Sequence, residues 1–372
     1  MLQDIKIAVV GLGSRGRSML RLAAGFPGVG IVALCDLKPQ LWSESQRLGQ
    51  KSLKDEFPEA EFYEDFRTML DKADFDLLIV ETPAHCHAEF CIAGLKAGKH
   101  VFSDIPTVRT LQEAKDLWET QRAADTLLMI GANPNEWGFV EALYDFWKHG
   151  LLGKPTYLEA EYIHDVRSLW EVSPWRRTRM PILYCTHSLG PLLRVIEGDL
   201  RKVSCLSTGG QIDGAPDEHD LMTAHFHTDD DVVVRLTVSS INYAGCGLHS
   251  YRVMGTAGYF ERLAERGKSD ARCVIRSEKL YGLKKGAELV IDKSRPEYAN
   301  TPGAQAGHGG ADYALFDHFF TALRSGAKSA PIDLREGLRM TLPGIYAAES
   351  ALRGGAELPI RYPWDDDFST EI

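Results

Sequence analysis

The residues best suited to proton transfer in this 372-residue chain gather between positions 162 and 187. His187 lies three residues after Tyr184, and the near-neutral pKa of histidine suits it to accept a proton from a hydroxyl group. If a helix begins at His187, the two side chains can flank one pocket. Tyr162, on an expected strand, offers a second phenol, which becomes a base when nearby cations lower its pKa of about 10. The pattern predicts acid–base chemistry, with packing or surface roles as the alternative for each residue.

A glycine-rich loop near the N-terminus predicts a dinucleotide site. Gly11, Gly13 and Gly16 follow the β-branched run Ile5–Val10 and lead into an expected helix, Ser18–Ala24. Glycines at this spacing allow a tight turn, a close approach of backbone to the pyrophosphate, and packing of helix on strand. The helix N-terminus then faces the phosphates.

The acid that follows the second expected strand indicates which dinucleotide binds. Asp36 lies twenty residues after Gly16, where a carboxylate accepts a hydrogen bond from the adenosine ribose and repels a 2′-phosphate. NAD is therefore favoured over NADP, with Arg15 and Lys38 as residues that soften the preference. An ordinary acid at the end of a strand is the alternative interpretation.

The elements that must position these residues alternate along the first third of the chain. Further strands are expected at 76–81, 99–104 and 127–131, and helices at 88–97 and 111–124. Such alternation predicts an α/β fold with a parallel, doubly wound sheet. After a boundary near residues 131–135, strands are expected at 156–164, 203–207, 221–227, 232–240, 250–254 and 274–277, with a hairpin turn at 229–231. The sequence also predicts a helix at 312–324.

Several segments resemble the glucose–fructose oxidoreductase/inositol dehydrogenase/MocA family over essentially the whole chain. They are Thr82-Pro83-Ala-His-Cys-His87, Ala97-Gly-Lys-His-Val-Phe102 and Asp104-Ile105-Pro106. The resemblance implies a Rossmann domain (1–132) and a C-terminal α/β domain (133–372) with an open, mostly antiparallel sheet. The last helix and strand are candidates to pack back on the first domain. The expected cofactor-binding residues are Gly11, Gly13, Ser14, Arg15, Gly16, Asp36, Thr82, Pro83, His87, Asp104 and Pro106.

Two departures separate this chain from the dehydrogenases that it resembles. Those enzymes carry Glu-Lys-Pro, and their lysine helps to move the hydroxyl proton, whereas Ile105 in this chain cannot take a proton. They also carry an aspartate four residues before a catalytic histidine, where this chain has Leu183 before His187.

Three other segments resemble glycoside hydrolase family 109, the NAD-dependent glycosidases. They are Tyr184-Cys-Thr-His187-Ser-Leu-Gly-Pro191, Tyr162-Ile-His164-Asp165-Val-Arg167 and Gly307-His308-Gly-Gly, although Cys185 and Ser188 depart from the family's Pro and Gly. The resemblance implies transient oxidation at C3, elimination of the C1 aglycone after loss of the C2 proton, water addition and re-reduction. The expected catalytic residues are His187, Tyr184 and Tyr162, and the expected substrate-binding residues are Asn133, His164, Arg167, Trp175, Arg176, Arg179 and His308.

The sequence leaves the substrate open. Arg167, Arg176, Arg177 and Arg179 lie close together, so they either form a solvated loop or grip an anion on the sugar. The substrate is therefore expected to be an N-acetylhexosaminide or an anionic hexoside such as a uronide or sulfoquinovoside. The alternative functions are an NAD-dependent sugar dehydrogenase and a non-enzymatic sensor of NAD and sugar.

Composition narrows the partners and the location. Lys plus Arg is 42 against 52 for Asp plus Glu, and the net charge of −10 disfavours nucleic acid. The sequence shows no apolar run of the ~20 residues that cross a bilayer, so no membrane partner is expected. Seven cysteines without Cys-x-x-Cys spacing favour reduced thiols in a cytoplasmic protein and no metal site. A homo-oligomer that binds a small glycoside is expected.

Overall fold

The computed structural model divides the chain into two compact units. It describes residues 4–45, 49, 51–171, 173–177, 180–212, 214, 219–264, 271–277, 287–291, 296–298, 301 and 307–372. The first unit comprises Met1–Gly131, Thr301–Ala306 and Asp312–Gly337, and the second comprises Ala132–Asn300, Gly307–Ala311 and Leu338–Ile372. Each unit is therefore built from segments that lie far apart in the sequence.

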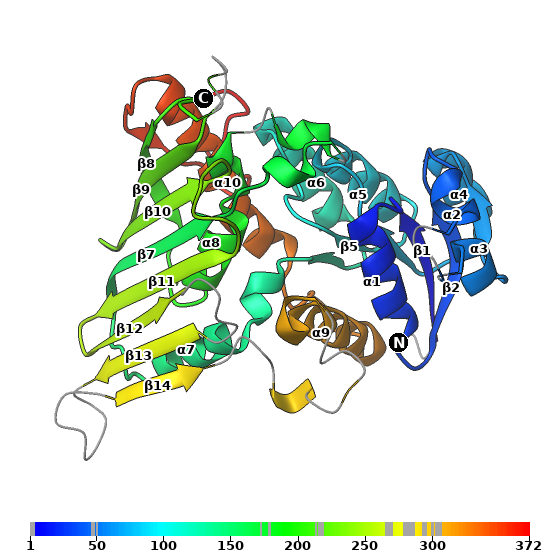
Figure 1. The fold of residues 1–372 in the computed structure, drawn as a ribbon, viewed down its shortest axis with the longest axis horizontal. Helices are drawn as coiled ribbons and strands as arrows, with labels where there is room; N and C mark the ends of the chain where they lie inside the picture. The colour runs from blue at the N-terminus through cyan, green and yellow to red at the C-terminus, as the bar shows by residue number, and fades with distance from the viewer. Residues whose placement is uncertain are drawn as a thin grey trace. The chain divides into compact units, whose positions relative to one another are not determined.

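A six-stranded parallel sheet forms the centre of the first unit (Figure 1). Its strands are β1 (Ile5–Val10), β2 (Val29–Cys35), β3 (Glu61–Tyr63), β4 (Leu77–Val80), β5 (His100–Ser103) and β6 (Leu128–Ile130). The order β3-β2-β1-β4-β5-β6 is that of a dinucleotide-binding Rossmann sheet. Its helices are α1 (Ser14–Ala24), α2 (Gln40–Ser43), α3 (Leu53–Glu56), α4 (Phe66–Lys72), α5 (His87–Lys96), α6 (Leu111–Ala123) and α9 (Ala311–Ser325). The predicted α/β class is confirmed.

The late helix α9 supplies aromatic side chains to the core of the first unit. Phe316 stacks on Phe320 with ring centroids 5.4 Å apart, and both rings are fully buried. Phe26, which follows α1, lies 5.1 Å from the ring of Phe320, and Phe102 of β5 lies 4.9 Å from that of Phe316. Aromatic pairs at these distances add to the stability that burial provides, so α9 is part of this core.

A nine-stranded mixed sheet forms the second unit. Its strands are β7 (Pro155–Ile163), β8 (Leu200–Ser207), β9 (Leu221–Thr228), β10 (Val233–Ser239), β11 (Leu248–Gly255), β12 (Gly258–Leu263), β13 (Ala271–Ser277), β14 (Ala287–Ile291) and β15 (Leu358–Pro359). The order is β14-β13-β12-β11-β7-β10-β9-β8-β15, with β7 and β10 parallel and the other pairs antiparallel. The sheet is mostly antiparallel, as predicted, and β9 and β10 form the predicted hairpin.

The last strand corrects one expectation. β15 pairs with β8 of the second sheet, where Leu358 is opposite Val203, and most of the last helix, α10 (Leu334–Leu352), also belongs to the second unit. The element that returns to the first unit is α9, because its aromatic face matches the apolar side chains there.

The two faces of the second sheet differ in character. α7 (Gly138–Lys148), α8 (Thr186–Leu193) and α10 lie along one face (Figure 1). On β7, Leu158 and Ala160 are fully buried between strand and helices. Between them, Glu159 forms ion pairs with Arg235 of β10 and Arg252 of β11. Alternation along one strand thus separates an apolar layer from a charged layer.

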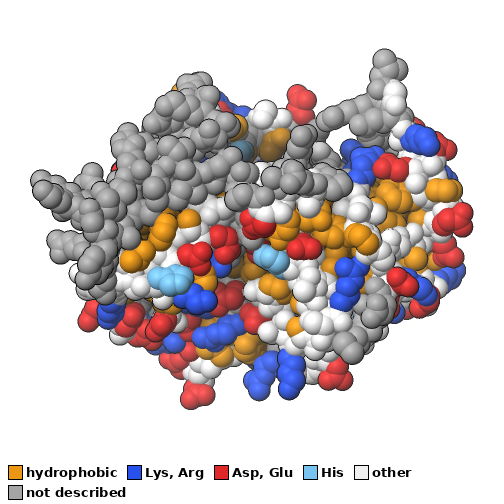
Figure 2. All heavy atoms as spheres, turned by 90° about the horizontal axis from the view of Figure 1, so that it is seen from below, with side chains coloured by type: hydrophobic (Ala, Val, Ile, Leu, Met, Phe, Trp, Pro, Cys, Tyr) orange, Lys and Arg blue, Asp and Glu red, His pale blue; other side chains and the backbone are white. Residues whose placement is uncertain are grey.

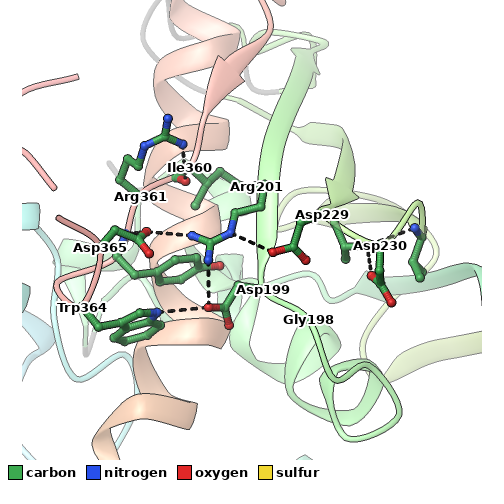
Figure 3. Close-up of polar contacts among 12 residues, drawn as sticks. Gly198, Asp199, Arg201, Asp229, Asp230, Ile360, Arg361, Trp364 and Asp365 are labelled. Carbon is green, nitrogen blue, oxygen red and sulfur yellow. Dashed lines mark hydrogen bonds and ion pairs between the residues drawn. The ribbon is translucent and has the colours of Figure 1, made fainter. Parts of the chain in front are cut away.

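A polar cluster centred on Arg201 fixes the C-terminal segment to β8 (Figure 3). The guanidinium lies 2.7 Å from Asp365 and 3.4 Å from Asp199, and the Arg201 carbonyl accepts a hydrogen bond from Ile360 at 2.8 Å. Trp364 donates its indole N–H to Asp199 at 3.0 Å. The short strand β15 therefore depends on side-chain contacts as well as on ladder hydrogen bonds.

The surface carries charges of both signs. Figure 2 shows Lys and Arg side chains interspersed with Asp and Glu on the face in view. Among the described residues, no helix has both the length and the apolar character that crossing a membrane requires. The six cysteines whose side chains are described are free thiols, whereas Cys273 lies outside that set.

We predict that Arg201→Ala lowers the free energy of unfolding by about 1–3 kcal/mol, because it leaves Asp365 without its cation and loosens Asp199. Denaturant titration followed by tryptophan fluorescence measures the change. Lys202→Ala, one position along β8 in a pair exposed on both sides, is the control and is expected to change stability by no more than about 0.5 kcal/mol. Equal losses in both variants would contradict the role given to Arg201.

Candidate active site

The glycine loop combines two sterically required glycines with one that borders open space. A Cβ on Gly11, whose φ is +92°, would lie 2.5 Å from the Glu81 carbonyl oxygen, and one on Gly16 would lie 1.9 Å from that of Gly11. A Cβ on Gly13 would meet no atom within 4 Å. α1 begins at Ser14 directly after this loop. The space beside Gly13 and the free N–H groups of the helix start fit a pyrophosphate.

Asp36 is fixed beside this loop at the end of β2. One carboxylate oxygen accepts the Leu12 backbone N–H at 2.8 Å, and the other accepts the Lys38 backbone N–H at 3.0 Å. A carboxylate oxygen has two lone pairs, so each oxygen retains one for a ribose hydroxyl. The observed position fits the predicted ribose contact, and Lys38 contributes its backbone here.

The two loops after β4 and β5 are joined by a buried histidine. One ring nitrogen of His87 lies 2.7 Å from the Thr82 carbonyl oxygen, and the other lies 2.8 Å from that of Pro106. Both ring nitrogens are therefore engaged by backbone. His87 holds the predicted cofactor loops, including Pro83, in fixed positions. Ile105, in the second of these loops, is buried at 7% exposure.

Arg15 is paired with an acidic side chain of the same chain. Its guanidinium binds both carboxylate oxygens of Asp312 at 2.7 and 3.0 Å, a bidentate ion pair across 297 residues of sequence. Its Nε lies 3.9 Å from Glu81 and 3.8 Å from Asp104. The predicted contact of Arg15 with the cofactor stays a prediction, and Asp312 is a partner that sequence reasoning missed.

Glu81 ends the strand segment below the glycine loop, and its side chain is fully buried. Burial raises the pKa of its carboxyl well above the ordinary range, and the nearby charge of Asp104 raises it further. The charge of Arg15 acts in the opposite direction, but burial and Asp104 outweigh it. The protonated form of Glu81 is therefore favoured by its surroundings beneath the glycine loop.

The second unit brings the three predicted acid–base residues together. The Tyr184 hydroxyl lies 3.2 Å from Nε2 of His187, a hydrogen-bond distance. The ring of Tyr162, on β7, lies 5.3 Å from that of Tyr184 and 5.5 Å from that of His187. α8 begins at Thr186, so His187 occupies its first turn as expected. Two phenols and an imidazole thus form one largely buried cluster.

Three contacts seat α8 so that His187 has a fixed backbone. A Cβ on Gly190 would lie 2.2 Å from the Asn135 side-chain oxygen, so only glycine allows this approach. The Cys185 thiol donates to the Met340 carbonyl at 3.2 Å, which explains how Cys185 replaces a proline of the resembling family. The Tyr251 hydroxyl donates to the His187 carbonyl oxygen at 2.8 Å.

His249 belongs to the cluster, and sequence reasoning missed it. Its ring lies 4.7 Å from that of Tyr162 and 5.3 Å from that of Trp137, and it is 6% exposed. In the sheet, His249 of β11 is directly opposite Tyr162 of β7. Only the strand pairing carries this signal, because 87 sequence positions separate the two residues.

His164 and His308 lie within electrostatic reach of each other. The Gly247 N–H donates to Nδ1 of His164 at 3.2 Å, which leaves the proton of a neutral ring on Nε2. Burial lowers the pKa of His164, and the charges of Arg176 and His308 lower it further. His308 is exposed and has a φ of +61°, a conformation that is uncommon for a residue with a Cβ and that clusters at functional sites.

Arg167 is not free to grip an anionic sugar. Its guanidinium binds both oxygens of Asp165, the shortest contact being 2.6 Å, and also donates to the Asn242 carbonyl at 2.9 Å. Hydrogen bonds from Arg167 lower the pKa of Asp165, so this carboxylate stays ionised. The guanidinium of Arg177 lies 5.1 Å from the ring centroid of Trp170. Arg167 and Arg177 therefore each contact other side chains of the protein.

The remaining predicted substrate residues are placed less fully. Asn133 is buried in the short helix Asn133–Glu136, which contacts α8. Trp175 and Arg176 belong to a 3₁₀ turn, Pro174–Arg176, in which the Trp175 side chain lies outside the described set. Arg179 also lies outside the described residues.

Comparison with known proteins identifies the cofactor. Residues 5–132 match the family model GFO_IDH_MocA, described as an oxidoreductase family with an NAD-binding Rossmann fold. The match confirms the resemblance to the Gfo/Idh/MocA family and the prediction of NAD. It makes the chain an enzyme of NAD-dependent, oxidoreductase-like type.

Relatives and a solved structure extend the resemblance to the whole chain. A glycosyl hydrolase family 109 protein of Solibacter usitatus is 28% identical, with 96% of this chain and 87% of that protein aligned. An alpha-N-acetylgalactosaminidase of Shewanella oneidensis is 26% identical over 51% of this chain and 44% of that protein. A levoglucosan dehydrogenase in complex with NADH and levoglucosan shares the fold, with a TM-score of 0.78, 17% identity, and 96% and 100% of the two chains covered.

We predict that Glu81→Gln raises the apparent unfolding temperature at pH 8 and that the gain shrinks toward pH 5. The pKa of Glu81 is higher in the folded than in the unfolded chain. Glu81 thus contributes stability below its unfolded pKa of about 4.3, which is lost as pH rises through the folded pKa. Glutamine resembles the neutral acid and does not ionise, so the variant escapes this loss and its gain is expected to be largest at pH 8.

Calorimetric scans between pH 5 and pH 8 measure the effect of Glu81→Gln. Glu89→Gln is the matched control, because Glu89 is 59% exposed in its pair with Arg67. This variant is expected to differ from wild type by the same small amount at every pH in the scan. A Glu81→Gln variant that is less stable than wild type at pH 8 would mean that an ionised Glu81 pairs with Arg15.

Proposed function

We propose that this protein is an NAD-dependent glycoside hydrolase that cleaves by oxidation, elimination, hydration and reduction. The observation that carries the proposal is the 3.2 Å contact of Tyr184 with His187, beside the ring of Tyr162. The similarity to glycosyl hydrolase family 109 proteins supports it. Ile105 also supports it, because an isoleucine cannot perform the proton transfer expected of the lysine in related dehydrogenases.

The cofactor and the residues that hold it belong to the first unit. Gly11, Gly13, Gly16 and Asp36 would hold the adenosine and pyrophosphate portions, with Ser14, Thr82, Pro83, Asp104 and Pro106 as further contacts. Bound NAD would supply a hydride acceptor for the sugar and, at the end of the cycle, a hydride donor. The protein must therefore retain the dinucleotide through a complete turnover.

His187 is assigned to the hydroxyl at C3. Its Nε2 faces the Tyr184 hydroxyl, so a proton taken from the sugar passes along a hydrogen bond that already exists. Oxidation of C3 to a ketone makes the neighbouring C2–H acidic. The imidazole returns the proton when the ketone is reduced at the end of the cycle.

A tyrosine is assigned to the C2 proton. The ring of Tyr162 lies against those of Tyr184, His187 and His249, so it belongs to the same cluster as the base for C3, and Tyr184 is the alternative. Loss of the C2 proton expels the aglycone from C1 and leaves a double bond between C1 and C2. Water then adds across that bond.

Direct displacement at C1 has less support. That mechanism uses two carboxyl groups on either side of the glycosidic bond, one of which must be protonated. Of the carboxyl groups beside Tyr162 in sequence, Glu161 pairs with Arg235 at 3.2 Å, and Asp165 is kept ionised by Arg167. The histidines and tyrosines therefore carry the proton transfers.

An N-acetylhexosaminide is the substrate class that we propose first. One relative of this chain is named an alpha-N-acetylgalactosaminidase, and Arg167 is already neutralised by Asp165. An anionic hexoside is the second class, for which Arg176 and Arg179 are the predicted contacts. Cytoplasmic location and a homo-oligomeric state stay predictions from the sequence.

We predict that turnover in D₂O places deuterium at C2 of the released sugar while NADH does not accumulate. A proton held on a tyrosine exchanges with solvent before it returns to carbon, and the last step consumes the reduced cofactor. A panel of neutral and anionic nitrophenyl glycosides identifies a cleaved substrate, and NMR of the product locates the label. Steady NADH accumulation with no label at C2 would instead establish a sugar dehydrogenase.

We also predict that His187→Ala lowers kcat by ~10²–10⁴-fold, the usual contribution of a general base. NAD affinity is expected to stay within threefold, because the glycine loop belongs to the other compact unit. His225→Ala is the control, since His225 is exposed on β9. A loss of kcat below threefold for His187→Ala would remove this residue from the mechanism.

A further inference from the structure

The loop between β10 and β11 presents an aromatic ring to solvent. Tyr243 is 79% exposed, whereas Tyr162 and His187 of the acid–base cluster are 7% and 8% exposed. An aromatic ring in water keeps a flat apolar face available for contact with another flat apolar surface. Tyr243 therefore differs in accessibility from the aromatic residues assigned to proton transfer.

The loop that carries Tyr243 is held in one conformation. The Asp165 N–H donates to the Gly245 carbonyl at 3.0 Å, and the Gly245 N–H donates to the Asn242 side-chain oxygen at 3.0 Å. The guanidinium of Arg167 donates to the Asn242 carbonyl and lies 5.0 Å from the centroid of the Tyr243 ring. The ring is thus positioned before any ligand arrives, which reduces the entropy lost on binding.

The same loop is bonded to the acid–base cluster. The Gly247 N–H donates to His164 at 3.2 Å, and the His164 ring stacks on that of Tyr162 with centroids 5.3 Å apart. β7 and β10 are parallel, so the residues that follow both strands lie at the same end of the sheet, the end formed by their carboxyl termini. Tyr243 and the cluster therefore lie at the same end of the strands in the second unit.

We propose that Tyr243 is the platform on which the aglycone of the glycoside stacks. The inference rests on the proposed glycosidase function. The buried residues act on C2 and C3 of the sugar, so the part of the substrate that departs to solvent is the part that an exposed ring can contact. The aglycone that fits is one with a flat apolar face, either an aryl group or the C–H face of a second pyranose. The guanidinium of Arg167 supports the ring from one side.

The test compares an aryl glycoside with a methyl glycoside of the same sugar. For Tyr243→Ala, the KM for the nitrophenyl glycoside is expected to rise about three- to tenfold, whereas that for the methyl glycoside stays within twofold. Tyr243→Phe keeps the ring and is expected to match wild type. Leu206→Ala, at another exposed apolar side chain of the same unit, is the control and changes neither value. Equal changes for both glycosides in Tyr243→Ala would overturn the platform.

Binding separates this inference from the proposed function. Calorimetric titration with 4-nitrophenyl N-acetyl-α-galactosaminide and its methyl counterpart, in the presence of NAD, needs no turnover. If wild type cleaves no glycoside, the glycosidase proposal fails, yet weaker binding of the nitrophenyl compound alone by Tyr243→Ala still supports the platform. Identical dissociation constants for wild type and Tyr243→Ala would overturn it whether or not cleavage occurs.

Discussion

The close approach of α8 to its neighbours governs the acid–base cluster. Gly190 leaves no room for a side chain against Asn135, and Gly344 leaves none against the Cys185 thiol, since a Cβ there would lie 2.6 Å from the sulfur. The helix can occupy this seat only because both positions lack a Cβ. His187 and Tyr184 are carried by the seated helix and the turn before it, so their 3.2 Å contact is set by packing. Preorganised groups lose little entropy when they act on a substrate.

Charge imposes a second constraint, in the first unit. Arg15 faces three carboxyl groups, and the bidentate pair with Asp312 satisfies only one of them. Burial and the nearby charge of Asp104 raise the pKa of Glu81, which disfavours a further ionised carboxylate here.

Local patterns predicted much of this structure, and pairings distant in sequence account for the rest. The β-branched run Ile5–Val10 predicted a strand, and the spacing around His187 predicted a helix that begins there. Both agree with the structure. The three residues of β3 are too few to show a period. β12 was missed because Glu261 and Arg262 make it look polar, although Arg262 is 2% exposed.

In the candidate site, too, local patterns predicted some residues and distant pairings supplied the others. Tyr184 and His187 were found from their spacing on one short segment. His249 enters the cluster through the register of β11 on β7, and Asp312 reaches Arg15 from a helix near the other end of the chain. No local pattern encodes either contact. The sequence motifs thus named the candidate residues, whereas the sheet pairing and the helix α9 supplied contacts of His249 and Arg15 that no motif indicates.

The placement of α9 also bears on how the chain matures as it leaves the ribosome. Phe26 and Phe102 are synthesised early, yet their aromatic partners Phe316 and Phe320 emerge only after the entire second sheet apart from β15. Domains generally fold in the order of synthesis, but here the nucleotide-binding unit cannot close its core first. The rings of Phe316 and Phe320 can join this core only after the strands β7–β14 have been synthesised.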